Sequence, residues 1–170
     1  ALAAAYYETS GNTNRIVRER AADTSCVLDR ASEVLAAIPG RPASLPGAHA
    51  AHLVGFSVGG AVSTEAAMRD DRALSVTNLD GGTYGTIDVR SLAHPCLMMY
   101  SQRNAGMNDL LLPDHARRIV AERTMHLNYH DVAHLVPGLK VFRAIGRADP
   151  RAFLRYRNET VRAFCAEAIR

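Results

Sequence analysis

The sequence predicts an α/β fold of three layers, in which a mostly parallel sheet carries helices on both faces. Short apolar runs recur along the chain, and segments with apolar residues at helical spacing separate most of them. Strands that alternate with helices form right-handed βαβ units, which place their strands in one parallel sheet. The chain shows no internal repeat and no low-complexity segment, so we expect residues 1–170 to form a single domain.

The first elements are identified from apolar runs and from the turn residues between them. Residues 2–7 (LAAAYY) predict a strand, and a turn and helix-cap cluster follows at 9–13. Apolar positions recur at helical spacing over 15–37, and Pro39-Gly40 predicts the end of that helix. A Pro-rich loop follows at 41–50.

The middle of the chain contains a strand, a glycine-rich turn, a helix and a second strand. Residues 52–56 (HLVGF) predict a short buried strand, and the turn at 57–60 leads into an Ala-rich helix that ends near Arg69. Residues 74–79 predict the next strand, which runs into Asp80-Gly81-Gly82.

The last part of the chain repeats this alternation. Residues 96–100 (CLMMY) form an apolar run that predicts a buried strand. A helix is expected over 113–123 because Pro and Asp begin it, and the alternating pattern of 125–129 predicts a strand. Asp149 as N-cap and Pro150 at the first helical position predict a closing helix.

Composition and charge exclude several classes of function. Hydrophobic residues make up 48% of the chain and charged residues 22%, and no apolar run reaches the roughly 20 residues that span a bilayer. The formal net charge is small, 20 − 17 = +3, and the basic residues are scattered along the sequence instead of forming a patch. We therefore expect no membrane span and no nucleic-acid partner.

The cysteines give no sign of a metal or redox site. Cys26, Cys96 and Cys165 lie far apart and lack CxxC spacing. Their apolar and helical surroundings predict buried free thiols, and one disulfide is the alternative in an exported protein. We expect neither a metal nor a cofactor.

The stretch 55–59 (GFSVG) matches the pattern G-x-S-x-G between an expected strand and an expected helix. In α/β-hydrolases this pattern forms the nucleophile elbow, where Gly55 and Gly59 leave room for neighbouring elements and Ser57 projects above the carboxyl edge of the sheet. The N–H of Val58, at the start of the helix, is the expected oxyanion donor. We predict Ser57 as a nucleophile; the alternative is a glycine-rich turn with an incidental serine.

A serine nucleophile needs a general base, and seven histidines compete for that role. In α/β-hydrolases the order is Ser, acid, His, each after a strand. His130 and His134 follow the strand expected at 125–129, and His134 lies deeper in the loop, beside the Pro137-Gly138 break. We therefore predict His134 as the base. The two histidines also resemble the zinc motif H-E-x-x-H, which needs a helix and a third ligand that we do not expect here.

Two carboxylates are candidates for the acid that orients the base. Asp80 ends the strand that follows the elbow helix, whereas Asp109 lies nine residues beyond Tyr100 and is expected to cap a helix. The carboxyl end of a strand gives Asp80 the better reach to His134, so Asp80 is preferred and Asp109 is the alternative. The competing role for Asp80 is to cap the Gly-Gly turn that follows it.

The elbow at 55–60, Asp80 and the loop 132–134 together resemble the platelet-activating-factor acetylhydrolase branch of the α/β-hydrolases, including its bacterial dienelactone-hydrolase-like relatives. In that branch the acid follows the serine by 23 residues, which is the spacing from 57 to 80 here. The similarity extends upstream to strand 2–7 and downstream to the closing helix. It implies the same nucleophile, acid, base and oxyanion donor: Ser57, Asp80, His134 and Val58.

The chain departs from this family on its N-terminal side. The family's earlier strands, and the loop that supplies its second oxyanion donor, have no counterpart in the sequence. The resemblance therefore implies the C-terminal part of a hydrolase domain, with unpaired sheet edges. The alternative to an enzyme is a truncated, weakly active or inactive domain that forms homo-oligomers or other contacts through these edges.

The short connection after Asp80 bears on the substrate. About 15 residues separate Asp80 from the next expected strand, too few for a helical lid. An open site favours small or short-acyl esters, so the expected partner is a small-molecule ester. The expected reaction is hydrolysis through an acyl-enzyme, and acyl transfer is the alternative that these residues do not separate from it.

Overall fold

The computed structural model describes residues 11–40, 50–85, 88–136, 138 and 145–169, and every structural statement below concerns these residues. Within them the sheet has four parallel strands in the order β1-β2-β3-β4. The α/β fold predicted from the sequence is confirmed. The strand expected at 2–7 lies outside the described residues. The four strands are β1 (Ala51–Phe56), β2 (Ala73–Leu79), β3 (Cys96–Ser101) and β4 (Arg117–Ala121).

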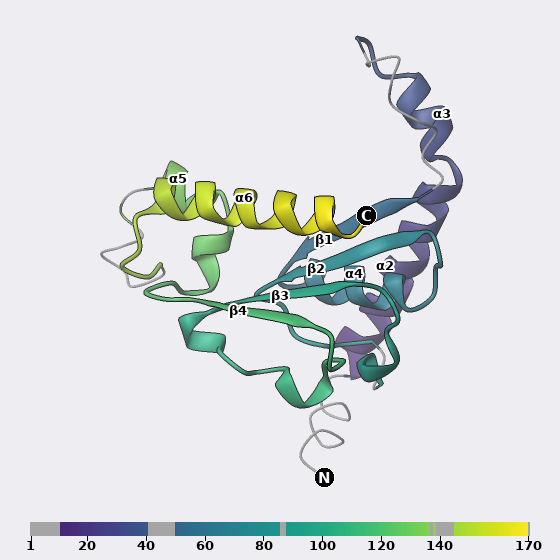
Figure 1. The fold of residues 1–170 in the computed structure, drawn as a ribbon. Coiled ribbons are helices and arrows are strands. Elements are labelled where there is room, and N and C mark those ends of the chain that lie inside the picture. Colours follow the sequence, from purple (N-terminus) through teal and green to yellow (C-terminus); the bar gives the residue numbers. More distant parts are fainter. Residues whose placement is uncertain (1–10, 41–49, 86–87, 137, 139–144, 170) are drawn as a thin grey trace.

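Helices cover both faces of the sheet (Figure 1). Helices α2 (Gly11–Asp29) and α4 (Val58–Ala67) pack on one face, whereas α6 (Pro150–Glu167) packs on the other. Two short helices, α3 (Ala31–Ala36) and α5 (Val132–Leu135), follow α2 and precede α6 along the chain. This arrangement gives the three expected layers.

The side chains of β3 divide the core between the two faces. Met98 and Tyr100 belong to the cluster that includes residues of α2 and α4, and Leu97 and Met99 pack with the phenylalanines of α6. All four are almost completely buried. Burial of one such side chain stabilises the fold by about 1.5–3 kcal/mol. The centre of the sheet is therefore stable, and it supports the loops at its carboxyl edge.

The chain between β3 and α6 differs from expectation. Residues 113–123, predicted as a helix, contain β4, which pairs with β3 from Leu97↔Arg117 to Ser101↔Ala121. The β-branched residues of β4 and its pairing with β3 override the helix-start signal. Residues 125–129, predicted as a strand, contain the 3₁₀-helix η4 (His126–Tyr129). The expected end of the last strand was therefore 129 − 121 = 8 residues too far along the chain.

The first and last helices follow the sequence signals more closely. The helix expected over 15–37 forms as α2 and α3, and it begins earlier, at Gly11. The closing helix α6 has Asp149 as its N-cap, which accepts a hydrogen bond from the Ala152 N–H at 2.8 Å, and Pro150 at its first position. This capping prediction is confirmed.

The three thiols are all free. Cys96 is buried in β3 as expected, and burial raises its pKa to about 12. Cys165 is half-buried, and Cys26 is exposed on α2, so the expectation that all three thiols are buried is wrong. No helix among the described residues combines the length and apolar character needed to cross a bilayer.

Candidate active site

Ser57 lies at the sharp turn between β1 and α4, at the carboxyl edge of the sheet. Its backbone has φ 56° and ψ −125°, a conformation that a residue with a side chain adopts only under strain. The Ser57 N–H donates to the Leu79 carbonyl at 3.0 Å, and its carbonyl accepts from the Gly60 N–H at 2.9 Å. A strained serine between a strand and a helix is the geometry expected of a nucleophile elbow.

Close packing explains two of the glycines around Ser57. A Cβ atom at Gly55 would lie 2.0 Å from the Gly59 carbonyl oxygen, and one at Gly60 would lie 2.1 Å from Asn78 Oδ1. A Cβ atom at Gly59 would meet nothing within 4 Å. The prediction that Gly59 is required to avoid a clash is therefore wrong. After the serine, the crowded position is Gly60.

His126 connects Ser57 to Asp80. Its Nε2 lies 2.9 Å from Ser57 Oγ, and its Nδ1 lies 2.8 Å from Asp80 Oδ2. Because an ionised carboxylate can only accept, Nδ1 carries the hydrogen, and Nε2 is left to accept from the serine hydroxyl. The imidazole packs against Phe56, with ring centroids 4.7 Å apart. This arrangement lets a histidine take the proton of a serine.

Asp80 is a buried carboxylate at the end of β2. Its Oδ1 accepts from the Ser101 N–H at 2.6 Å, and its Oδ2 accepts from Asn104 Nδ2 at 2.9 Å as well as from His126. These donors compensate the cost of burying the charge and turn one oxygen toward the imidazole. Burial, and then the charge of Asp80, raises the pKa of the neighbouring Tyr129 phenol.

The structure does not bring His134 to the serine. His134 lies in α5, and neither of its ring nitrogens has a hydrogen-bond partner among the described residues. The prediction of His134 at this position is therefore corrected to His126. Asp109 is also elsewhere, since its Oδ1 accepts from the Tyr100 hydroxyl at 2.9 Å and lies 3.5 Å from Arg118 Nε. Of the two candidate carboxylates, the one that meets the histidine is Asp80.

The sequence does not predict His126 as the base, because the pattern of 125–129 places this residue inside an expected strand. The last strand ends at Ala121, and His126 is the first histidine after it. The signal that could have found it is the run 117–121 (RRIVA), whose β-branched pair favours a strand over a helix.

A buried side chain holds the turn that carries His126. Asn128 Oδ1 accepts from the Met125 N–H at 2.8 Å and from the Gly146 N–H at 2.7 Å. Just before the turn, Thr124 Oγ1 donates to the Ala121 carbonyl at 2.6 Å. The imidazole is therefore positioned by side chains that satisfy loop backbone groups.

A hollow of about 430 Å³ opens beside the serine. Val58 is the first residue of α4, and the first N–H groups of a helix have no partner within that helix. Its N–H is therefore suited to donate to an anion formed in the hollow, and its role as oxyanion donor stays a prediction. The lining includes Ser57, Val58, Tyr84, Arg103, Met107 and His126.

No family model and no curated protein matches the chain. Among solved structures, the chain is similar to a ferulic acid esterase from Streptomyces cinnamoneus, with a TM-score of 0.72 and 23% sequence identity. The two chains share a fold. The match covers 91% of this chain and 49% of the other, so this chain spans about half the length of that esterase.

Proposed function

We propose that the protein is a serine hydrolase that cleaves small or short-acyl carboxylic esters. The observation that carries this proposal is the hydrogen-bond chain from Ser57 Oγ through His126 to Asp80, with distances of 2.9 and 2.8 Å. The fold shared with an esterase supports an ester as the substrate class. The resemblance of the elbow and the Asp80 spacing to the platelet-activating-factor acetylhydrolase branch supports it further.

The proposed reaction proceeds in two steps through an acyl-enzyme. Ser57 Oγ attacks the ester carbonyl while His126 Nε2 takes its proton, and Asp80 stabilises the imidazolium. The tetrahedral intermediate collapses, and the departing alcohol receives the proton from His126. Water then attacks the acyl-enzyme with His126 as the base, which releases the acid and restores the serine.

The start of α4 and the size of the hollow define the remaining roles. The Val58 N–H and the helix dipole stabilise the oxyanion, and one donor of this kind typically contributes about 10²–10³-fold to turnover. The hollow of about 430 Å³ accommodates a short acyl chain with a small alcohol. We therefore propose small or short-acyl esters, such as acetyl and butyryl esters, as substrates.

The test is hydrolysis of p-nitrophenyl acetate and butyrate, together with labelling by a fluorophosphonate. We expect both in the wild-type chain, and loss of both in Ser57→Ala. Ser32→Ala is the matched control, because Ser32 is an exposed serine of α3, away from the site. A chain that hydrolyses neither ester and whose Ser57 stays unlabelled refutes the proposal. Addition of an alcohol acceptor separates hydrolysis from acyl transfer.

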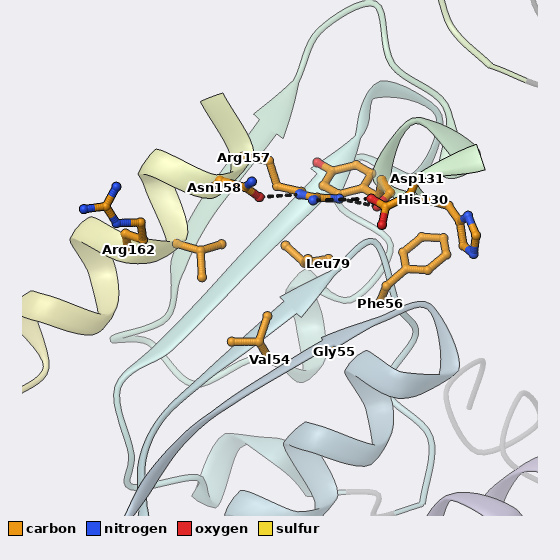
Figure 2. Close-up of a pocket in the computed structure, with 11 residues that line it drawn as sticks. Val54, Gly55, Phe56, Leu79, His130, Asp131, Arg157, Asn158 and Arg162 are labelled. Carbon is orange, nitrogen blue, oxygen red and sulfur yellow. Dashed lines mark hydrogen bonds and ion pairs between the residues drawn. The ribbon is translucent and has the colours of Figure 1, made fainter. Parts of the chain in front are cut away.

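A second candidate function is self-association along β1. Among the described residues β1 pairs with β2 alone, and Val54 in this strand is 47% exposed. A hollow of about 540 Å³ lies beside this strand. Figure 2 shows that Val54, Phe56 and Leu79 line one side of it and Arg157 of α6 the other. A free strand edge of one copy is complementary to the same edge of another. Light scattering after size exclusion that finds a dimer with unlabelled Ser57 favours this function, and a monomer with labelled Ser57 excludes it.

A further inference from the structure

Three arginines around the site have side chains that form no ion pair with any residue that the structure describes. Arg103 lines the hollow beside Ser57, and Arg123 and Arg147 line a second hollow of about 520 Å³. The two hollows adjoin, because Met125 lines both of them. Within the described ranges none of the three guanidinium groups forms an ion pair. We call the two hollows together the basic groove.

The backbone of Arg123, at the far end of the basic groove, is held by two hydrogen bonds. Gln102 Oε1 accepts from the Arg123 N–H at 2.7 Å, and the Arg123 carbonyl accepts from the Ala148 N–H at 2.9 Å. These bonds hold Arg123 at φ 59°, in the left-handed region that residues with a side chain rarely adopt. A Cβ atom at Gly146 would lie 2.2 Å from the Arg123 carbonyl oxygen, so Arg147 follows a segment packed directly on Arg123.

Negative charge is scarce along the basic groove. Asp80 is the one carboxylate among the described residues that line it, and its oxygens are taken by Ser101, Asn104 and His126. Elsewhere an arginine such as Arg72 is neutralised by carboxylates, at 2.8 Å from Asp29 and from Asp70. Arginines left unpaired in a concave surface attract anions, and the guanidinium fork matches a carboxylate.

We propose that the substrate is an anionic ester, with a carboxylate that Arg103 binds while Ser57 attacks the ester carbonyl. The inference rests on the proposed function and names the substrate class of that site. Arg103 makes the site specific for anionic esters by donating two parallel hydrogen bonds to the carboxylate. Arg123 and Arg147 bind the acidic groups of a longer substrate further along the basic groove.

The test compares esters that differ only in a terminal charge. The p-nitrophenyl half-esters of adipic and suberic acid are matched with p-nitrophenyl hexanoate and octanoate, which have the same carbon number and leaving group. We expect kcat/KM of the wild-type chain to favour the half-esters by about tenfold, mainly through KM. Added salt should reduce this preference, because it screens the exposed guanidinium groups.

Single substitutions assign the preference to the basic groove. Arg103→Gln is expected to lower the ratio of half-ester to neutral-ester kcat/KM by about tenfold. Arg147→Gln is expected to affect the longer suberate more than the adipate. Arg155→Gln, at an exposed arginine of α6 outside the basic groove, is the matched control and should keep the ratio. A wild-type chain that prefers the neutral esters, or an Arg103→Gln variant that keeps the ratio, overturns the inference.

Failure of this inference can be distinguished from failure of the proposed function. Hexanoate turnover that is lost in Ser57→Ala supports the proposed function even where the half-esters show no advantage. If no ester is hydrolysed and Ser57 stays unlabelled, the proposed function fails and an ester substrate fails with it, and ligand-observed NMR with adipate then tests the anion site alone. Adipate binding that Arg103→Gln abolishes supports an anion site, and absence of binding in the wild-type chain overturns it.

Discussion

Replacement of His126 by glutamine, beside the same replacement at His134, tests the site most directly. His126 makes both hydrogen bonds of the candidate triad, at 2.9 Å to Ser57 and 2.8 Å to Asp80, so its loss removes the proton acceptor and the link to the carboxylate. Because general-base catalysis contributes up to about 10⁴-fold, we expect kcat/KM to fall about 10³–10⁴-fold, or about 4–5.5 kcal/mol of transition-state stabilisation.

The fold should survive this change. The His126 side chain is 39% exposed, and Asp80 keeps its donors Ser101 and Asn104, so the midpoint of thermal unfolding should move by only a few degrees. His134→Gln is expected to retain activity near that of the wild-type chain, because the His134 ring contacts neither Ser57 nor Asp80 through a hydrogen bond.

The assay is hydrolysis of p-nitrophenyl butyrate, with thermal unfolding followed by circular dichroism as the control for folding. An active His126→Gln variant beside an inactive but folded His134→Gln variant would return the base to His134 and refute the geometry described above. Two variants that both retain full activity would refute both His126 and His134 as the base.

Other changes test the acid, the elbow and the stability of the loop before β2. Asp80→Asn should lower kcat by about 10³–10⁴-fold in esterase assays, since an amide fixes the wrong imidazole tautomer, and an unchanged kcat contradicts this role. Gly55→Ala places a Cβ atom 2.0 Å from the Gly59 carbonyl and should cost about 3 kcal/mol in urea unfolding, whereas Gly59→Ala meets nothing within 4 Å and should be tolerated. Hydrogen bonds from Arg72 lower the pKa of Asp70 far below 3.8. The stability that ionised Asp70 gives to the fold is therefore complete above pH 3.8 and is lost as the pH falls below that value. The unfolding free energies of wild type and Asp70→Asn should therefore converge as the pH falls from 3.8, and a constant difference contradicts the ion pair.

The fold and the serine turn could be predicted because their signals are local. Strands and helices alternate in the sequence, and the G-x-S-x-G pattern of the elbow stands between one of each. Asp80 could also be predicted, because residues 74–79 predict a strand, and Asp80 directly follows that strand at the carboxyl edge. In each of these cases the deciding residues are adjacent in the sequence.

The histidine could not be placed in the same way. β4 begins with two exposed arginines, at 117 and 118, so the sequence of this strand lacks a clear apolar pattern. The strand forms because it pairs with β3 from Leu97 to Ser101. The alternation of 125–129 is typical of a strand, but Asn128 holds this segment in a turn by accepting from the N–H of Gly146, 18 residues further along the chain. Both outcomes depend on long-range pairing that overrides local preference.

The choice between the two carboxylates depends on the turn that follows β3. The Ser101 N–H at the end of β3 and the Asn104 side chain in the turn after it direct the two oxygens of Asp80, which directly follows the neighbouring strand β2. Asp109 follows the same turn, but it accepts from the Tyr100 hydroxyl, and burial together with that hydrogen bond raises the pKa of Tyr100. A phenol kept protonated in this way remains a donor and holds Asp109 away from the imidazole. The choice of Asp80 as the candidate acid therefore depends on the donors at the end of β3 and in the turn after it, which hold its carboxylate where one oxygen can meet His126.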